Sequence, residues 1–178
     1  MPLLLLKQLP RFECLLQAAN RYPDLNPGAA SAFLHLLRTG DLIFDSEAAC
    51  LAASGLSQGR FSILMLLNRH PDTPQTPATL ADESGVTRAT ITGLLDTLEK
   101  DALVQRTSSP DDRRLTLVHL TPKGIALMDS LLPGYFRHVS TLLAPLSPEE
   151  RTQLVDLLQK IQQGLGEPAP SSNCSQSH

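Results

Sequence analysis

The feature that most constrains the fold of this 178-residue chain is a repeated change of periodicity over residues 80–121. A short helical run at 80–84 is broken by Gly85, and a second helical run covers 87–100. A strand–turn–strand pattern follows, and its turn lies at 108–114. A helix-turn-helix that leads directly into a hairpin with a basic tip is the layout of a winged helix, a structure that reads duplex DNA. We therefore predict a mainly α fold with a small β-wing, in which a winged helix-turn-helix domain is carried on a helical dimerisation frame.

The outer face of the helix predicted at 87–100 suits a close approach to DNA. With Ile91 as the origin of a helical wheel, the residues on the core side are apolar: Ile91, Leu94, Leu95 and Leu98. The residues opposite and beside this stripe are small, polar or basic: Arg88, Ala89, Thr90, Thr92, Gly93, Asp96 and Thr97. Small and hydroxylated side chains permit entry into a major groove, and Thr87 as N-cap leaves amide groups that can meet a phosphate. Taken alone, the same face would equally suit the tight packing of another helix.

The hairpin distinguishes between these two interpretations. Alternating side chains over 104–107 and 115–120 predict its two strands. Three side chains are predicted to point inward: Leu115, Leu117 and either Val118 or Leu120. The tip carries Arg113 and Arg114, and arginines delivered beside a major-groove contact can enter the narrow, electronegative minor groove. Asp112 is placed to hold one of the two guanidinium groups and to leave the other free.

Helices are predicted on both sides of this module. They run over 1–22 with a kink or split at Pro10, over 29–54, over 58–69, over 122–144 with a bend at 133–134, and from 148 to 164. The predicted N-caps are Ser57, Thr79, Thr87 and Ser147, the last in a capping box with Glu150. The apolar stripes of the terminal helices are larger than a small monomer core requires, so we expect these helices to pack against a second copy.

The predicted organisation therefore has four segments. They are N-terminal dimerisation helices at 1–56, a winged helix-turn-helix DNA-binding domain at 57–124, C-terminal dimerisation helices at 125–166 and a disordered tail at 167–178. Within the DNA-binding domain, the helix-turn-helix is expected at residues 79–100 and the wing at residues 103–121.

The distribution of charge bears on how such a domain would bind. The chain has a net charge of −3, but residues 57–124 hold eight Lys/Arg and eight Asp/Glu, so the excess negative charge lies elsewhere. A neutral module is a weak electrostatic footprint for a nucleic-acid partner. We therefore expect tight binding to double-stranded DNA to need two modules side by side.

Other classes of protein fit the sequence poorly. The apolar run at residues 3–6 is too short for a membrane span, so we expect a cytoplasmic protein with no membrane partner. The cysteines, Cys14, Cys50 and Cys174, lack metal-ligand spacing, and the five histidines are scattered, so we predict neither a metal nor a cofactor. The chain also lacks a Gly-rich phosphate loop and a recognisable pair of nucleophile and base, so we predict that it is not an enzyme.

Residues 80–100, 103–104 and 111–124 resemble the MarR (multiple antibiotic resistance regulator) family, and the wing is the more specific part of this resemblance. The resemblance implies a homodimeric repressor whose terminal helices form the dimer and which binds a pseudo-palindromic operator. It also implies that a small ligand, often phenolic or aromatic, or the oxidation of a cysteine releases the DNA. Relative to the simplest members, residues 1–28 form an extra N-terminal helix, which either enlarges the dimer interface or covers the ligand cleft.

The resemblance also implies roles for individual residues. It places Thr87, Arg88, Thr90 and Thr92 in the major groove or on phosphates, Arg113 in the minor groove, and Asp112 as a brace for Arg114. Together with the helical wheel, the candidate DNA-binding residues are Thr87, Arg88, Ala89, Thr90, Thr92, Arg113 and Arg114, with Asp112 as wing support.

Two alternatives to a ligand-responsive repressor remain open. A redox-sensing repressor would act through Cys14 or Cys50, both on predicted apolar helix faces, where a cysteine is more often a small hydrophobic residue. A winged helix used only for protein contacts would need an apolar outer face at 87–100, which the sequence lacks. The low aromatic content, 4% with no Trp, indicates a ligand pocket lined by Leu, Ile and Phe, which suits an apolar effector.

Overall fold

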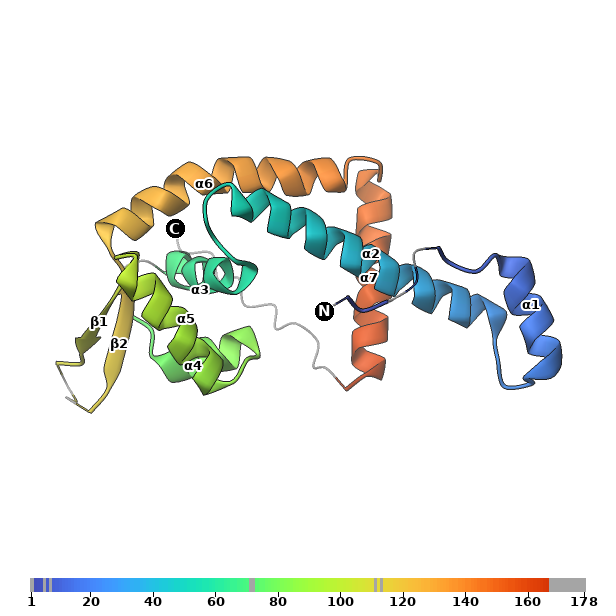
Figure 1. The fold of residues 1–178 in the computed structure, drawn as a ribbon, viewed down its shortest axis with the longest axis horizontal. Helices are drawn as coiled ribbons and strands as arrows, with labels where there is room; N and C mark the ends of the chain where they lie inside the picture. Colours follow the sequence, from blue (N-terminus) through green and yellow to red (C-terminus); the bar gives the residue numbers. More distant parts are fainter. Residues whose placement is uncertain are drawn as a thin grey trace. The chain divides into compact units, whose positions relative to one another are not determined.

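The computed structural model describes residues 2–4, 6, 8–70, 73–110, 112 and 114–166 (Figure 1). Its elements follow in the order α1 (Phe12–Arg21), α2 (Pro27–Ala52), α3 (Gln58–Arg69), α4 (Pro77–Ser84), α5 (Arg88–Lys100), β1 (Val104–Ser108), β2 (Thr116–Leu120), α6 (Pro122–Leu142) and α7 (Pro148–Gly164). The chain divides into two compact units, Met1–Leu132 and Pro133–His178, and α6 runs through the boundary. The mainly α fold with a two-stranded wing is confirmed. The tail predicted at 167–178 lies outside the described residues.

Helices α2, α3, α4, α5 and α7 start where a side chain caps the first amide groups, whereas α1 has no side-chain cap. Ser57 accepts a hydrogen bond from the Arg60 N–H (3.3 Å) at the start of α3. At α7 the predicted capping box is present, because Ser147 Oγ accepts from the Glu150 N–H (3.2 Å) and Glu150 Oε2 accepts from the Ser147 N–H (2.7 Å). In the same turn, a backbone hydrogen bond and the Ser147 hydroxyl lower the pKa of the Glu149 carboxyl.

The start of α4 differs from the prediction. The N-cap is Thr76, whose hydroxyl oxygen accepts from the Thr79 N–H at 3.1 Å, so the prediction that Thr79 caps this helix is wrong. The reason is Pro77, whose fixed φ suits the first helical position and whose missing N–H costs nothing there. Helix α2 likewise begins two residues before the predicted Ala29, with Asn26 as its cap and Pro27 at its first position.

The N-terminal segment is helical only from Phe12, so the prediction of helix over 1–22 was too long. Pro10 accounts for part of the difference, since it cannot donate a helical hydrogen bond. The N–H groups of Leu3 and Leu4 instead donate to the Asp41 carboxylate of α2, at 2.6 and 2.9 Å. The Asp41 residue is only 7% exposed, so these two bonds satisfy a buried charge in the middle of α2. Helix α1 then packs against α2.

The core of the first unit joins the end of α2, helices α3 to α5, the hairpin and the first turns of α6. Its fully buried large side chains are Leu51, Ile63, Leu64, Leu80, Ile91, Leu95, Leu98, Val104, Val118 and Met128. Full burial of a side chain of this kind stabilises a fold by about 1.5–3 kcal/mol relative to exposure. This core holds the two helices of the helix-turn-helix and the root of the wing as one body.

The wing is an antiparallel pair in which Val104 lies opposite Leu120 and Ser108 opposite Thr116. Val118 also exchanges hydrogen bonds with Gln75, at 2.9 and 2.7 Å, so the segment before α4 extends the pairing. Val118 and Leu120 are both buried, whereas Leu115 is 49% exposed, so its predicted inward position is wrong. Leu115 precedes the strand, and its N–H belongs to the turn, where it donates to the Asp112 carbonyl at 2.9 Å.

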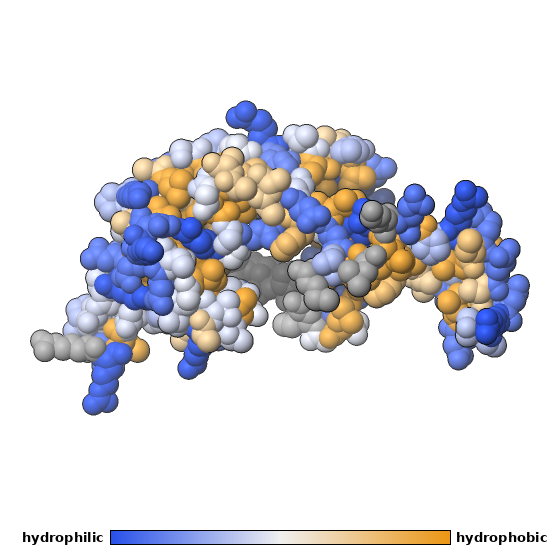
Figure 2. Space-filling model, viewed as in Figure 1, coloured by the Kyte–Doolittle hydropathy of each residue, from blue (hydrophilic) through white to orange (hydrophobic). Residues whose placement is uncertain are grey.

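Many large apolar side chains on α1, α2 and the second unit are exposed. Hydrophobic surface lies over α1 and α2 in Figure 2. Large exposed side chains on these helices include Phe12, Leu16, Phe33, Leu42, Ile43 and Phe44. In the second unit they include Phe136, Leu154, Val155, Leu157 and Ile161, and α7 has no buried residue. Among the described helices, none combines the length and apolar character needed to cross a membrane.

Candidate nucleic-acid interface

Helix α5 presents two sharply different faces. Ile91, Leu95 and Leu98 are fully buried. The residues predicted to face outward are all exposed: Arg88, Ala89, Thr90, Thr92, Gly93, Asp96 and Thr97. The small and polar face is therefore surface, and within the described chain no other helix packs on it.

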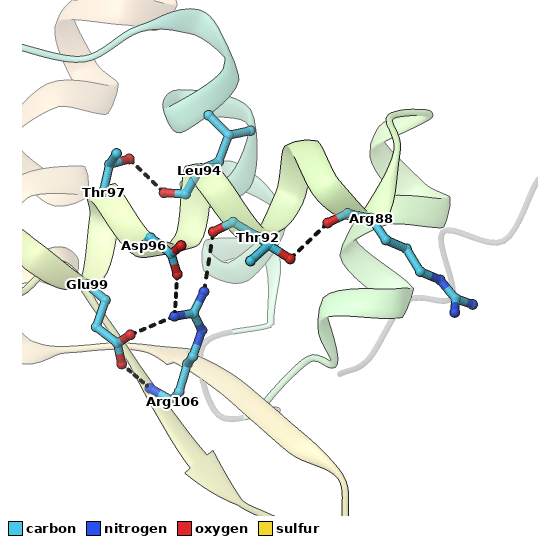
Figure 3. Close-up of polar contacts among 7 residues, drawn as sticks. All are labelled: Arg88, Thr92, Leu94, Asp96, Thr97, Glu99 and Arg106. Atoms are coloured by element: carbon cyan, nitrogen blue, oxygen red, sulfur yellow. Dashed lines mark hydrogen bonds and ion pairs between the residues drawn. The ribbon is translucent and has the colours of Figure 1, made fainter.

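The hydroxyl groups of this face are held by the helix itself. Thr87 is the N-cap of α5, and its Oγ1 accepts from the Thr90 N–H at 3.2 Å. Thr92 Oγ1 donates to the Arg88 carbonyl at 2.9 Å (Figure 3). Each hydroxyl that has donated its proton to the backbone keeps its acceptor lone pairs for an outside partner. The hydroxyl groups of Thr87 and Thr92 are thus held by hydrogen bonds within the helix.

Arg88 is the cation of this face. Its side chain extends away from the first turn of α5 into solvent (Figure 3), and its guanidinium makes no ion pair with the described residues. A guanidinium with all five donors available suits a phosphate or a base edge. This position at the N-terminal end of α5 also adds to the positive end of the helix dipole.

Arg106 on β1 is a residue that sequence reasoning missed. Its Nη1 lies 2.7 Å from Asp96 Oδ1 and 2.8 Å from Glu99 Oε2, and its backbone N–H donates to Glu99 Oε1 at 3.2 Å (Figure 3). Its Nη2 also reaches the Thr92 carbonyl at 3.4 Å. Arg106 therefore fastens the wing to the exposed side of α5, and its single positive charge offsets one of the two carboxylate charges that would otherwise repel a phosphate backbone.

A sequence signal for Arg106 exists, although it is weak. Asp96 and Glu99 are one helical turn apart and therefore share a side of α5. An arginine on the strand that leaves this helix is a natural partner for such a pair. The spacing alone does not say which basic residue of the hairpin takes that place, because the pairing depends on how the strand crosses the helix.

Asp112 accepts two hydrogen bonds from residues that follow it in the wing. Its Oδ1 accepts from the backbone N–H of Arg114 at 2.9 Å, and its carbonyl accepts from the Leu115 N–H at 2.9 Å. The described contact of Asp112 with Arg114 is therefore with the backbone, whereas the sequence suggested a bond to a guanidinium. Arg114 is exposed. Arg113, the predicted minor-groove residue, lies outside the described residues.

The joint between α5 and the wing is tightly determined. The Leu103 N–H donates to the Leu98 carbonyl (2.9 Å) and the Ala102 N–H to the Glu99 carbonyl (2.8 Å), which is the Schellman ending of a helix. Ala102 takes the left-handed conformation that this ending requires, with φ of 56°. Gly124 of α6 lies so close to this joint that a Cβ there would stand 2.1 Å from the Leu103 carbonyl oxygen. Only glycine allows that approach.

Comparison with known proteins identifies the family that this geometry belongs to. Residues 56–116 match the MarR family. The chain is 37% identical over 153 residues to the HTH-type transcriptional repressor YetL of Bacillus subtilis, a match that covers 86% of this chain and 92% of that protein. The chain belongs to the MarR family. It is also 36% identical over 132 residues to the HTH-type transcriptional repressor NicR of Pseudomonas putida, with 71% and 80% covered.

Solved structures agree with this assignment to the MarR family. The MarR family regulator Sco3205 of Streptomyces coelicolor in complex with DNA has a TM-score of 0.73, covers 83% of this chain and 96% of its own, and at 22% identity supports the fold. The structure of Bordetella bronchiseptica BpsR, whose DNA binding is regulated by 6-hydroxynicotinic acid, is also similar. BpsR is 27% identical to this chain, with a TM-score of 0.63, and the match covers 72% of this chain and 91% of its own. The protein is a DNA-binding transcriptional regulator of MarR type.

Two further features of this MarR protein concern other chemistry. Within the described ranges, no group of three or more His, Cys, Asp or Glu side chains is arranged to hold a metal ion. Cys14 and Cys50 are free thiols, and Cys14 is exposed in the single chain. Cys50 is half-buried, and Cys174 lies outside the described residues.

Proposed function

We propose that this MarR protein is a homodimeric repressor that binds a pseudo-palindromic operator and releases it when a small apolar or aromatic ligand binds. The observation that carries the proposal is the exposed, small and polar face of α5, fastened by Arg106 to a wing with a basic tip. Thr87, Arg88, Ala89, Thr90 and Thr92 are then the major-groove and phosphate contacts. Arg113 and Arg114 are the wing contacts, and Asp112 holds the turn that presents them.

The proposed dimer is supported by the exposed apolar side chains outside the core. Phe12, Leu16 and Phe33 on α1 and α2, and Leu157 and Ile161 on α7, are 48–60% exposed in the single chain. Exposed apolar area of this extent is uncommon on a monomer and is typical of an interface. Because one electrically neutral module binds DNA weakly, a second copy would also supply the missing affinity. Light scattering should give twice the chain mass of 19.3 kDa, and a monomeric mass at micromolar concentration would exclude the dimer.

Release by a ligand is supported by the relatives. The DNA binding of BpsR is regulated by 6-hydroxynicotinic acid, which is a heteroaromatic acid. An effector of similar size, with an aromatic or otherwise apolar body, is therefore the class to test first on this chain.

The experiment that tests DNA reading is the selection of bound sequences from a pool of random duplexes. The expected product is an inverted repeat whose half-sites are about one helical turn apart, because two copies of α5 would enter successive major grooves. Enrichment of no sequence, or of a single half-site, would contradict the homodimeric reading. The selected duplex then serves to screen aromatic acids for release by fluorescence anisotropy.

A redox-sensing repressor is a second candidate, because Cys14 is exposed and therefore accessible to oxidants. Treatment with peroxide should then weaken operator binding of the parent protein and leave the Cys14→Ser variant unaffected. Unchanged affinity of the parent after peroxide treatment removes this candidate. A winged helix used only for protein contacts is disfavoured by the polar face of α5.

A further inference from the structure

Gly93 lies on the exposed face of α5, where neither packing nor backbone conformation requires a glycine. Apart from the backbone of α5 itself, a Cβ at Gly93 would meet no atom of the described chain within 4 Å, and Gly93 is not among the glycines with positive φ. A glycine inside a helix is less stabilising than alanine, because it loses more backbone freedom on folding. The fold therefore gives no reason for Gly93, whereas a partner that approaches the α5 backbone closely does.

Ala89 extends this low part of the surface by one turn. It is exposed, and it lies four residues before Gly93 and therefore on the same side of α5. Neither side chain has a polar atom, so neither can hydrogen-bond to a base edge. Their contribution to DNA binding is to let the helix and its neighbouring side chains come close to the base pairs.

The threonines beside them use hydroxyl protons within α5. Thr92 Oγ1 donates to the Arg88 carbonyl at 2.9 Å (Figure 3). The hydroxyl oxygens of Thr87 and Thr90 lie 2.9 Å apart, so one of the two donates to the other. Thr92 therefore has no proton left for a base edge, and what it offers to DNA is its methyl group and the lone pairs of its oxygen.

Arg88 is the strongest hydrogen-bond donor of this face. Its guanidinium extends into solvent and makes no ion pair with the described residues (Figure 3). The planar fork of N–H groups matches the two acceptors of guanine in the major groove, O6 and N7. Thymine differs from the other bases in the same groove by its C5 methyl group, which makes apolar contact with alanine and threonine methyl groups.

We propose that α5 recognises a half-site with a guanine and a thymine close together, in which Arg88 donates to guanine O6 and N7 and the Thr92 methyl group contacts the thymine C5 methyl group. Ala89 and Gly93 are the small positions that permit this approach. Arg88 and Thr92 are four residues apart, which is about 6 Å along the helix axis. Base pairs are stacked about 3.4 Å apart, so the two bases lie within about two steps of each other. This inference rests on the proposed DNA contact of α5 and adds which bases are recognised.

The test uses the duplex enriched from the random pool, with single bases of each half-site replaced in turn. Uracil differs from thymine only by the missing C5 methyl group. At the contacted thymine, uracil should weaken binding by about fourfold in fluorescence anisotropy, as expected for one buried methyl group. At the contacted guanine, 7-deazaguanine lacks the N7 acceptor and should weaken binding by about tenfold.

Two variants of Thr92 separate its methyl group from its hydroxyl group. Thr92→Ser keeps the hydroxyl, so it should lose about fourfold in affinity and no longer distinguish thymine from uracil. Thr92→Val keeps a methyl group at the same place and should bind like the parent and retain the preference for thymine. Parental binding by Thr92→Ser together with weaker binding by Thr92→Val would assign the contact to the oxygen and overturn recognition of the methyl group.

Arg88→Ala tests the contact with guanine. The variant should bind the guanine and 7-deazaguanine duplexes equally, and a selection repeated with it should no longer enrich guanine at that position. Equal weakening on all duplexes, with a salt dependence reduced by about one unit of slope, would assign Arg88 to a phosphate and overturn the guanine contact.

Gly93→Ala tests the close approach. The melting temperature should rise by about 2–4 °C, because alanine favours the helix. Operator binding should weaken by about tenfold, because the added methyl group holds α5 away from the base pairs. Since stability and affinity move in opposite directions, unfolding cannot account for the loss. Parental affinity in Gly93→Ala would show that the α5 backbone does not approach DNA closely at this point.

The same measurements distinguish this inference from the proposed function. If the selection enriches no duplex, the proposed function fails and recognition of these bases fails with it. If a duplex is enriched, but uracil and 7-deazaguanine at every position of the half-sites leave its affinity unchanged, sequence-specific binding stands and recognition of guanine and thymine by α5 is wrong.

Discussion

The winged-helix module and the terminal helices use their apolar side chains in opposite ways. From α3 to β2, most leucine, isoleucine and valine side chains are buried. Helices α1 and α7 contain no buried residue, although both are amphipathic. Helix α7 starts with a capping box, and α1 packs against α2. The DNA-binding module therefore has its own core, whereas the terminal helices have an apolar face that remains exposed in the described single chain.

This contrast assigns the two parts different sources of stability. The module is stabilised by burial within the chain, so a change to its core should act on folding at any protein concentration. The terminal helices would be stabilised by association, so a change to their apolar faces should act on assembly and depend on concentration.

The largest effect is expected from breaking the association. Leu157 and Ile161 lie one turn apart on α7 and are 57% and 48% exposed. Replacing both by Asp should give a folded monomer, because a charge cannot be buried without a partner in an apolar interface. Loss of the second module should then weaken operator binding by about 10²–10⁴-fold. Sedimentation and anisotropy measure the two outcomes.

The control for this prediction is a pair that adds the same charge to α7 on the side opposite Leu157 and Ile161, Thr152→Asp with Gln163→Asp. It should remain a dimer with parental affinity. A Leu157→Asp, Ile161→Asp double variant that remains dimeric would place the interface on other helices.

The next effect concerns the module core. Leu95 is fully buried on α5. Leu95→Ala should lower the free energy of unfolding by about 2–5 kcal/mol, since it removes buried methyl groups and leaves a cavity. Leu157→Ala on α7 is the matched change at an exposed site. At a protein concentration below the dissociation constant of the dimer, it should change the free energy of unfolding far less. Urea unfolding at two protein concentrations measures both, and equal losses would contradict the contrast.

A smaller effect is expected from the DNA-facing arginines. Arg88→Ala and Arg113→Ala should each weaken operator binding by about 1–3 kcal/mol, and Arg88→Ala should also reduce the salt dependence if it contacts phosphate. Arg88 is exposed and outside the core, so the melting temperature and the mass of the assembly should stay at the parental values in Arg88→Ala. If both variants bind a selected operator like the parent, the assignment of these residues to the DNA contact is wrong.

Local patterns sufficed for much of this fold. The buried stripe of α5, the caps at Ser57, Thr87 and Ser147, and the hairpin after α5 all follow from side chains within a few residues of each other. The start of α4 is also a local matter, because Pro77 suits the first helical position and so makes Thr76 the N-cap. For such features, the rules of capping and periodicity contain the needed information.

Features that depend on contacts across space did not follow from the sequence. The Asp41 carboxylate binds the N–H groups of Leu3 and Leu4, which are 37 to 38 residues away, and this contact ends the helical pattern predicted at the N-terminus. Arg106 reaches α5 only because β1 crosses beside it. Periodicity describes which side of an element is apolar, but it does not say which other element will lie beside its polar side.

The smallest effect tests the joint that holds the reading helix to the wing. Ala102 has φ of 56°, a conformation that costs a residue with a Cβ about 1–2 kcal/mol and costs glycine almost nothing. Ala102→Gly should therefore raise the free energy of unfolding by about 0.5–1 kcal/mol, after the greater freedom of glycine in the unfolded chain is subtracted. Ala53→Gly is the matched control, because Ala53 has φ of −59° and ψ of −26° at the end of α2 and should lose stability on the same change. If urea unfolding gives changes in the free energy of unfolding of opposite sign for the two variants, the strain lies at Ala102. A loss of stability at both positions would mean that Ala102 is not strained and that the ending of α5 is held by its hydrogen bonds alone.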